Sequence, residues 1–373
     1  MDKSRNMNGL SLAVSVAEQN FHTATSLAIY NTALGLIVAL ARHPDARRVR
    51  ILANRDMIGQ LPRGDNVKVE TYDYAAGGSV GRVWWEQVGV HRAVAGRNDD
   101  WLILPKGFAA FVTPCPIRLA VYVHDIMAAV LADRYPGTFP RAKQAYFAAC
   151  YRASLKRARV VFTNTEFTRQ ELAHWATGQG LTCPPVRVVG HGVDPSSGDG
   201  VVAQKEDRIL VFVRRSAHKR TDLAVRYVEQ WRKDCDYKGS IVALGTLPEE
   251  LRLPQNGRWT HEERVPGTRY VDLIRQSRVA VHFSEYEGFG LPPLDAVLAG
   301  TCPVYSDLPP EREVMVGAGC PFDNGSYDAF AGAMNRAMSM PREQVKTWAD
   351  ALRARHDWRI VSDRVVSALR EFA

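Results

Sequence analysis

The sequence predicts an α/β protein with two doubly wound domains, each built on a parallel sheet. Short apolar runs rich in Val and Ile alternate with longer amphipathic stretches, as expected for strands joined by crossover helices. This alternation occurs in both halves of the chain. A chain of 373 residues is also long for one hydrophobic core.

The apolar runs give the expected order of strands. The first half contains LSLAVSV, VRILAN, DWLILP, RLAVYVHD, RVVFTNT and VRVVGHG, and the second contains RILVFVRR, GSIVALG, RVAVHFSE and CPVYSD. Small and polar residues between 194 and 207 cannot contribute a core face, so we place the boundary there. We therefore expect one domain over residues 1–195 and a second over 205–355. Ligands bind at the carboxyl ends of strands in such sheets, which predicts a site in a cleft between the domains.

The composition indicates an intracellular globular protein. It is 46% hydrophobic and 24% charged. The six cysteines are scattered without a CxxC pair, which argues against a metal framework or a disulfide scaffold. The apolar run near the N-terminus is short, and the uncharged stretch between Glu18 and Arg42 is too polar to span a bilayer. We expect a cytoplasmic protein without a membrane span.

The net charge of +8 is concentrated in the first half. Residues 1–195 hold 23 Lys and Arg against 15 Asp and Glu, which leaves 25 against 25 of the 48 and 40 in the whole chain. This asymmetry favours an anionic partner for the first half, either a membrane surface or nucleic acid, or else a basic surface without a partner. No nucleic-acid-binding motif accompanies it, so we do not expect nucleic acid to be a partner.

The segment most informative about chemistry is SEYEGFGLPPLDA, residues 284–296, which follows a predicted strand. Gly288 and Gly290 allow backbone amides to approach a ligand, and Pro292 or Pro293 suits the first turn of a helix. The N-terminus of such a helix favours a diphosphate. Glu287 and Asp295 bracket the loop, one at the strand end and the other in the first helical turn. Carboxylates in these positions suit sugar hydroxyls, although a helix cap with a glycine turn is an alternative.

This segment resembles the signature of the retaining family 4 glycosyltransferases, a glutamate followed after seven residues by a second glutamate around a GFGLP-like loop. The resemblance extends over roughly residues 120–360. It includes GTCPVYSDLPPEREV (300–314) downstream, and VHD (123–125), TNTEFTR (163–169) and HGVD (191–194) upstream.

The resemblance implies the GT-B fold, in which two Rossmann-like domains face each other across a cleft. It implies that Glu287 contacts hydroxyls of the donor sugar. The amides of Gly288, Phe289, Gly290 and Leu291 would hold the sugar or diphosphate. Asp295 would bind the ribose of the nucleotide, by a weaker or water-mediated contact because aspartate is one methylene shorter than the usual glutamate. Residues 356–373 resemble the terminal helix that crosses back to the first domain.

Basic residues follow the first strand of the second half, in RRSAHKR (214–220). Arg214 and Lys219 match the Arg-to-Lys spacing of the element that clamps the diphosphate in similar enzymes, although Val213 replaces the usual glycine. Such a clamp would stabilise the charge on the departing phosphate. His124, in VHD, resembles the cleft histidine that contacts the donor sugar, and Asp125 would orient its loop. The candidate catalytic residues are thus Glu287, His124, Lys219 and Arg214.

Two weaker motifs suggest other chemistry. Asp234-Cys235-Asp236 is a formal DxD, which binds metal in another glycosyltransferase fold, but its position predicts a surface turn. Gly288-Phe289-Gly290 is an incomplete dinucleotide fingerprint placed too late in the chain. We therefore expect no bound metal and no cofactor other than the nucleotide-sugar co-substrate.

The acceptor side is less defined. Residues 141–159 can form an amphipathic helix with a basic face, which would lie on an anionic membrane or pack as a solvated helix on the first domain. Similar enzymes have a glycine-rich loop near the acceptor, and these glycines are absent from residues 16–23. Trp84, Trp85 and Glu86 are alternative residues for shaping this side.

The sequence thus predicts transfer of a sugar from a UDP or GDP sugar to an acceptor hydroxyl, with retention implied by the resemblance. The acceptor would be a saccharide or a lipid-linked saccharide in surface polysaccharide assembly, at or near the inner face of the cytoplasmic membrane. The alternatives are an epimerase or phosphorylase with the same fold, and a catalytically silent protein that binds sugar nucleotides.

Overall fold

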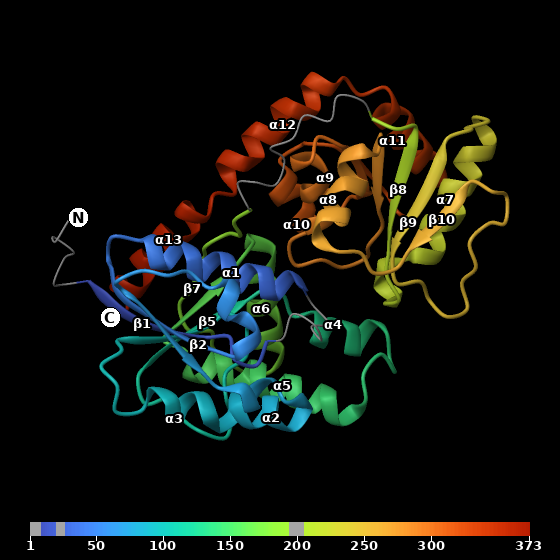
Figure 1. Ribbon diagram of the computed structural model, residues 1–373. Helices are drawn as coiled ribbons and strands as arrows, with labels where there is room; N and C mark the ends of the chain where they lie inside the picture. Colours follow the sequence, from blue (N-terminus) through green and yellow to red (C-terminus); the bar gives the residue numbers. More distant parts are fainter. Residues whose placement is uncertain (1–8, 20–26, 194–204) are drawn as a thin grey trace. The chain divides into compact units, whose positions relative to one another are not determined.

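The computed structural model describes residues 9–19, 27–193 and 205–373. The chain divides into two compact units, residues 1–194 with 356–373 (unit 1) and residues 195–355 (unit 2). Each unit contains one parallel sheet with helices on both faces (Figure 1), so the predicted fold class is confirmed. The segment expected to link the domains lies mostly outside the described residues.

Within its described part, unit 1 has a seven-stranded sheet with the order β3-β2-β1-β4-β5-β6-β7. Its strands are β1 (Leu10–Ser15), β2 (Ala46–Ala53), β3 (Val67–Thr71), β4 (Trp101–Leu104), β5 (Arg118–Val123), β6 (Val160–Thr163) and β7 (Val186–Val188). The central strands β1, β4, β5 and β6 are almost wholly buried because helices cover both faces of the sheet.

The two faces of this sheet are separate cores. Leu12 and Val14 of β1 pack with α1 and α13, whereas Ala13 packs with α5 and α6 on the other face, as the alternation of side chains along a strand requires. Figure 1 shows α1 and α13 side by side on one face. The helices are α1 (Leu27–Arg42), α2 (Gly78–Trp84), α3 (Val90–Val94), α4 (Met127–Arg134), α5 (Arg141–Arg157), α6 (Glu166–Gly178) and α13 (Trp358–Glu371), with short turns η1 (Arg55–Gln60), η2 (Asp73–Ala76) and η3 (Trp85–Gly89).

The C-terminal helix α13 belongs to unit 1 because of close packing around Trp358. A Cβ atom at Gly35 of α1 would lie 2.3 Å from the Trp358 ring, and one at Gly192 would lie 2.2 Å from it. Both glycines therefore make room for the indole. Beside it, Val193 forms a parallel bridge with Asp357, and its amide donates to the carbonyl of His356 at 2.8 Å. The chain therefore re-enters unit 1 next to the point where it left.

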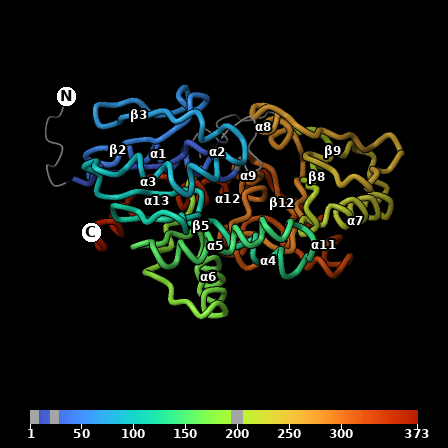
Figure 2. Tube along the Cα trace, turned by 90° about the horizontal axis from the view of Figure 1, so that it is seen from below, coloured from blue at the N-terminus to red at the C-terminus, as the bar shows by residue number. Residues whose placement is uncertain are grey.

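Unit 2 has a six-stranded parallel sheet in its described part, with the order β10-β9-β8-β11-β12-β13. Figure 2 shows α8 and α9 on one side of this sheet and α7 and α11 on the other. The strands are β8 (Arg208–Val213), β9 (Ser240–Gly245), β10 (Trp259–Glu262), β11 (Val279–His282), β12 (Cys302–Ser306) and β13 (Cys320–Phe322). The helices are η4 (Ala217–Lys219), α7 (Thr221–Asp234), α8 (Gly267–Gln276), α9 (Leu291–Leu298), α10 (Pro309–Met315), α11 (Tyr327–Met338) and α12 (Arg342–Arg355).

Both sheets have a point where the strand order reverses. In unit 1 it lies between β1 and β4, and in unit 2 between β8 and β11. In doubly wound sheets, ligands bind outside the carboxyl ends of the strands at such a point. These two points are where each sheet can bind a ligand. Among the described helices, none is long and apolar enough to cross a bilayer.

Candidate active site

The two segments singled out in the second half of the sequence meet at the switch point of unit 2. Strands β8 and β11 pair in register, with Phe212 opposite His282, so they end together. The backbone amide of Glu285, in the loop after β11, donates to the carbonyl of His218, in the turn after β8, at 2.7 Å. The guanidinium of Arg220 forms an ion pair with Glu285. The loop of residues 283–290 and the basic turn of residues 214–220 are therefore one structural element.

Glu287 is the acidic centre of this element. Its side chain is 9% exposed, and the ammonium of Lys219 forms an ion pair with its Oε1 atom. The Nε2 atom of His282 lies 3.3 Å from the same oxygen. In the part of the chain that the structure describes, Oε2 accepts no hydrogen bond. One oxygen is thus fixed by two nitrogen donors while the other is open to a ligand.

The environment keeps Glu287 ionised. Burial by itself would raise the pKa of a carboxyl, but the charge of Lys219 and the hydrogen bond and charge of His282 outweigh it and hold the pKa well below the ordinary 4.5. His218 is also buried, and burial together with the neighbouring Lys219 lowers its pKa to about 4, so it stays neutral. Glu287 can therefore act only as an acceptor of hydrogen bonds, which suits contact with hydroxyl groups.

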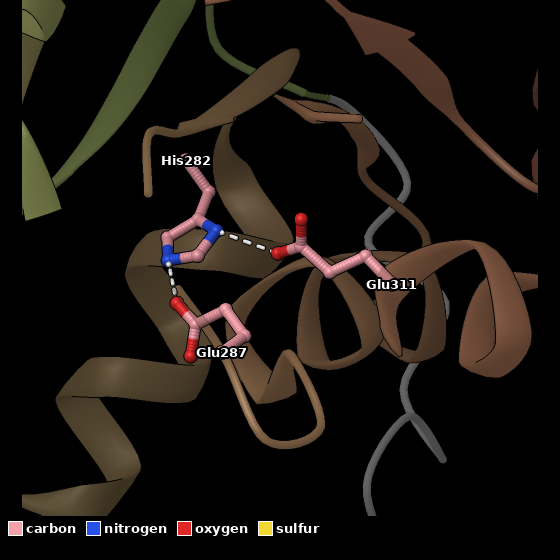
Figure 3. Close-up of side chains that lie close together, drawn as sticks. All are labelled: His282, Glu287 and Glu311. Atoms are coloured by element: carbon pink, nitrogen blue, oxygen red, sulfur yellow. Dashed lines mark hydrogen bonds and ion pairs between the residues drawn. The ribbon is translucent and has the colours of Figure 1, made fainter. Parts of the chain in front are cut away.

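Two further side chains that the sequence analysis did not single out as site residues complete the cluster. His282 ends β11, and its Nδ1 atom lies 3.1 Å from Oε1 of Glu311, on α10 (Figure 3). Glu311 is fully buried, and its Oε2 atom has no hydrogen-bond partner among the described residues. Burial raises the pKa of Glu311 to about 7, whereas hydrogen bonds to the two carboxylates outweigh burial and raise the pKa of His282.

His282, Glu287 and Glu311 each offer a ligand atom, and these atoms all lie within 4.8 Å of one another. The imidazole nevertheless stands between the carboxylates, with one ring nitrogen facing each, as Figure 3 shows. The ammonium of Lys219 also pairs with the Glu287 oxygen that faces the ring, which places a positive charge beside that oxygen. This arrangement suits a chain of hydrogen bonds better than a shared metal ion, which needs its ligands to converge on one point.

The glycine loop leads directly into α9. Gly290 has a φ of +88°, which is accessible to glycine, and a Cβ atom there would lie 2.6 Å from Cγ of Glu311. Helix α9 begins at Leu291 with proline in its first turn. Gly288 and Phe289 are buried beside Glu287, and Leu291 is half-buried.

Asp295 lies beyond the first turn of α9, which corrects the expected position, because the helix begins at Leu291 and not at a proline. The hydroxyl of Tyr270, on α8, donates to Oδ2 of Asp295 at 3.0 Å. Burial raises the pKa of Asp295 to about 6 despite this bond. The carboxylate of Asp295 is thus held by the phenol of Tyr270.

Arg214 directly follows β8, and its side chain is exposed. Its backbone is tied to the hydroxyl of Thr221, which accepts from the Arg214 amide at 2.9 Å and donates to its carbonyl at 2.7 Å. Within the described residues the guanidinium of Arg214 donates to no acceptor, whereas that of Arg220 pairs with Glu285. It is therefore a cation at the switch point that remains available to an anion.

His124 belongs to unit 1, where it follows β5. Its Nε2 atom lies 2.6 Å from the carbonyl of Pro105, and burial lowers its pKa to about 4. A carbonyl can only accept, so Nε2 carries the proton. In the neutral ring Nδ1 is then unprotonated and can accept a hydrogen bond. Asp125 accepts from the amide of Met127 at 2.8 Å and so shapes the start of α4.

Unit 1 carries an acidic cluster of its own after β1. The Glu86 carboxylate pairs with Lys106 and accepts from the hydroxyl of Tyr146. Glu18 is buried beside them, and burial raises its pKa to about 7. The sequence analysis named Glu86 for the acceptor side and missed Lys106 and Tyr146, which approach it from distant segments. Residues 20–23 of the expected acceptor loop lie outside the described residues.

The DxD lies away from the switch point of unit 2. Asp234 ends α7 and Asp236 is exposed beside Lys238, near the amino end of β9, so the DxD is a surface turn. The basic helix is α5. Its Arg157 donates to the carbonyls of Ala110 and Thr113 at 2.8 and 2.9 Å, so part of the basic face serves packing within unit 1.

Comparison with known proteins gives a sequence match for unit 2. Residues 199–355 match the family model described as glycosyl transferases group 1. A protein of Acidianus filamentous virus 2, ORF330, whose name assigns it to the glycosyltransferases, is 34% identical over 134 residues. That match covers 33% of this chain and 40% of the viral protein, so the chain spans about two fifths of the length of that relative.

Solved structures resemble the whole chain. Sucrose-phosphate synthase from Thermosynechococcus elongatus has a TM-score of 0.71 and 14% identity, covering 97% of this chain and 98% of its own. The E. coli trehalose-6-phosphate protein bound with UDP-2-fluoro glucose scores 0.64 at 11% identity, covering 96% and 99%. Anabaena HepE, in complex with UDP and glucose, scores 0.62 at 15% identity, covering 97% and 100%. At these identities the likeness establishes the fold, which is GT-B.

Proposed function

We propose that this protein transfers a sugar from a nucleotide-diphosphate donor to an acceptor hydroxyl, since residues 199–355 match the family model of the glycosyl transferases group 1 and the chain has the GT-B fold. The observation that carries the proposal is Glu287 at the switch point of unit 2. It is buried, ionised and anchored through one oxygen, with the other oxygen open and two cationic side chains nearby.

In this proposal Glu287 accepts hydrogen bonds from hydroxyls of the donor sugar. Lys219 and Arg214 bind the diphosphate, and the loop from Gly288 to Leu291 supports the sugar or phosphate through its backbone. Asp295, with Tyr270, contacts the ribose. The donor is a UDP or GDP sugar, in keeping with the UDP ligands named for two of the similar structures.

The reaction then depends on charge and position. The bond between the anomeric carbon and the phosphate oxygen breaks. The acceptor oxygen bonds to the same face of the sugar, so the anomeric configuration is retained. The acceptor proton passes to the departing phosphate oxygen. Lys219 and Arg214 stabilise the negative charge that develops on the phosphate. No protein nucleophile and no metal ion take part, and the nucleotide sugar is a co-substrate.

The acceptor side belongs to unit 1 in this proposal. His124 contacts the donor sugar through Nδ1. A saccharide or lipid-linked saccharide of a surface polysaccharide is the acceptor, and the basic surface of unit 1 associates with the anionic inner face of the cytoplasmic membrane.

Ligand screening and two pairs of variants test the assignment. UDP, GDP, UDP-glucose and GDP-mannose are first compared by thermal shift, since a ligand of the native state raises its melting temperature. With the donor that binds, Glu287→Gln and Lys219→Met should each lower sugar release or transfer on the order of a hundredfold. The exposed ion pair of Lys238 with Asp236 provides the matched controls Lys238→Met and Asp236→Asn, which should keep full activity.

Equal activity of all four variants would contradict the proposal. Products formed from donor alone separate the rival reactions, because an epimerase yields an isomeric nucleotide sugar and a transferase yields hydrolysed sugar. A phosphorylase requires inorganic phosphate. A silent binding protein shows a thermal shift without turnover of any donor and acceptor pair.

A further inference from the structure

We propose that His282, with its ring fixed by Glu311, is a positioning residue that holds the Glu287 carboxylate in the orientation in which it contacts the donor sugar. This inference rests on the proposed function and assigns a role to two residues that do not themselves face the ligand. Three features support it: the geometry of the ring, the possible proton arrangements, and the second contact that Glu311 makes with the glycine loop.

The ring is placed to link a buried carboxylate to the candidate sugar contact. His282 is 3% exposed at the end of β11, five residues before Glu287. Its Nδ1 atom lies 3.1 Å from Glu311, and its Nε2 atom lies 3.3 Å from Glu287 (Figure 3). Neither nitrogen is left for solvent or ligand. The His282 ring can therefore influence a bound ligand only through the carboxylate of Glu287.

Glu287 and Glu311 together determine which nitrogens of His282 carry a proton. Glu287 is ionised and can only accept, so Nε2 must carry a proton to bond to it. If Glu311 is ionised as well, Nδ1 is also protonated and the ring is an imidazolium. If Glu311 is protonated, its hydroxyl donates to Nδ1 and the neutral ring keeps its proton on Nε2. The neutral tautomer with its proton on Nδ1 would turn a lone pair toward the Glu287 carboxylate, and the charge of that carboxylate disfavours it.

This donor complements Lys219. Both nitrogens contact Oε1 of Glu287, and Lys219 is also the cation proposed to bind the diphosphate. When the ammonium turns toward a phosphate, His282 still fixes Oε1 and keeps Oε2 directed at the sugar. A second anchor is needed because a single hydrogen bond leaves a carboxylate free to rotate.

Glu311 also supports the loop directly. The space next to Gly290 is filled by Glu311, whose Cγ atom would lie 2.6 Å from a Cβ atom at that position. One buried side chain therefore contacts the loop backbone and, through His282, sets the orientation of Glu287. The loop and the carboxylate are positioned by the same residue.

The test measures how much the sugar contributes to the affinity for a sugar nucleotide. Affinities for UDP and UDP-glucose, and for GDP and GDP-mannose, are determined by calorimetry on the full chain, and the ratio within the pair that binds is the readout. Glu287→Gln sets the ratio expected without the sugar contact. His282→Phe and Glu311→Leu should each lower the ratio on the order of tenfold, to the value found for Glu287→Gln. Their affinity for the bare nucleotide should stay within about twofold of that of the unmodified protein.

A conservative variant separates positioning from packing. In Glu311→Gln the amide N–H can donate to Nδ1, so Nε2 remains the donor and the ratio should stay near that of the unmodified protein. The same logic applies to His282→Gln, whose amide reaches the position of Nε2, if the phenylalanine variant does not fold. An unchanged ratio in His282→Phe and Glu311→Leu, or equal weakening of nucleotide and sugar nucleotide, overturns the positioning role. If the unmodified protein binds no sugar nucleotide at all, the proposed function itself fails.

Discussion

Each of the two sheets has a buried glutamate and a lysine after the strands at its switch point, but the pKa values of the two glutamates are shifted in opposite directions. In unit 2, Lys219 and His282 both contact Glu287, and its pKa lies well below the ordinary value. In unit 1, the hydroxyl of Ser15 donates to Glu18 at 3.3 Å, while Lys106 pairs with Glu86 instead. Burial then raises the pKa of Glu18 to about 7.

The comparison shows that burial alone does not determine the charge of a carboxyl. Desolvation is the largest influence on both residues and acts in the same direction. The outcome depends on whether cationic donors reach the carboxylate itself or a neighbour. An ionised Glu287 can only accept hydrogen bonds, whereas Glu18 near neutral pH can also donate one. Unit 2 therefore presents a fixed acceptor and unit 1 a titrating group.

We expect the largest effect on stability when Glu287, the ionised glutamate of unit 2, is neutralised. Glu287→Gln leaves Lys219 and His282 without a counter-charge and should lower the free energy of unfolding by about 3 kcal/mol at pH 7. Because the folded-state pKa lies below the unfolded value of 4.5, the carboxylate contributes stability above pH 4.5 and loses it as the pH falls. Urea denaturation of both proteins between pH 3 and pH 8 should therefore show a deficit that shrinks in acid. A deficit independent of pH would show that charge is not its source.

Glu18→Gln should have an effect of the opposite sign. Because the folded-state pKa of about 7 exceeds the ordinary 4.5, the unmodified protein loses stability as the pH rises from 4.5 through 7. The variant lacks the titrating carboxyl, so its stability relative to the unmodified protein should rise between pH 4.5 and pH 8, on the order of 3 kcal/mol. The same urea series measures it. Parallel pH profiles for the two substitutions would remove the contrast between the units.

The smallest of these effects concerns the backbone that holds Glu287. Gly290→Ala combines a positive φ with a contact to the buried Glu311, and should cost about 1 kcal/mol. Gly267→Ala is the matched control in the same unit, because Gly267 begins α8 and a Cβ atom there meets nothing within 4 Å. Thermal unfolding compares the two variants. Equal melting temperatures would show that the loop yields and does not constrain Glu287.

Local patterns were sufficient to predict the fold and one part of the site. The alternation of apolar runs and helical stretches follows from covering both faces of a parallel sheet, as the wholly buried β1 illustrates. The glycine loop with Glu287 and the basic turn with Lys219 each follow a strand. Their common location follows from the pairing of β8 with β11, which joins side chains 68 positions apart.

The remaining parts depend on contacts that no local pattern encodes. His282 appears in the sequence as one polar residue at the end of an apolar strand, and its role requires Glu311, 29 positions away. Tyr270 reaches Asp295 from another helix across 25 positions. The two prolines lie in the first turn of α9, as predicted, but Gly290 in the left-handed conformation starts the helix at Leu291, which leaves Asp295 just beyond that turn.

The backbone bridge between Val193 and Asp357 has a consequence for protein engineering. Because the chain leaves unit 1 and returns to it at paired positions, unit 2 is topologically an insertion into an otherwise continuous unit 1. Exchanging unit 2 for the corresponding unit of a similar protein requires only two adjacent splice points. The short gap between the ends also allows unit 1 to be closed with a tight turn and produced without its insert.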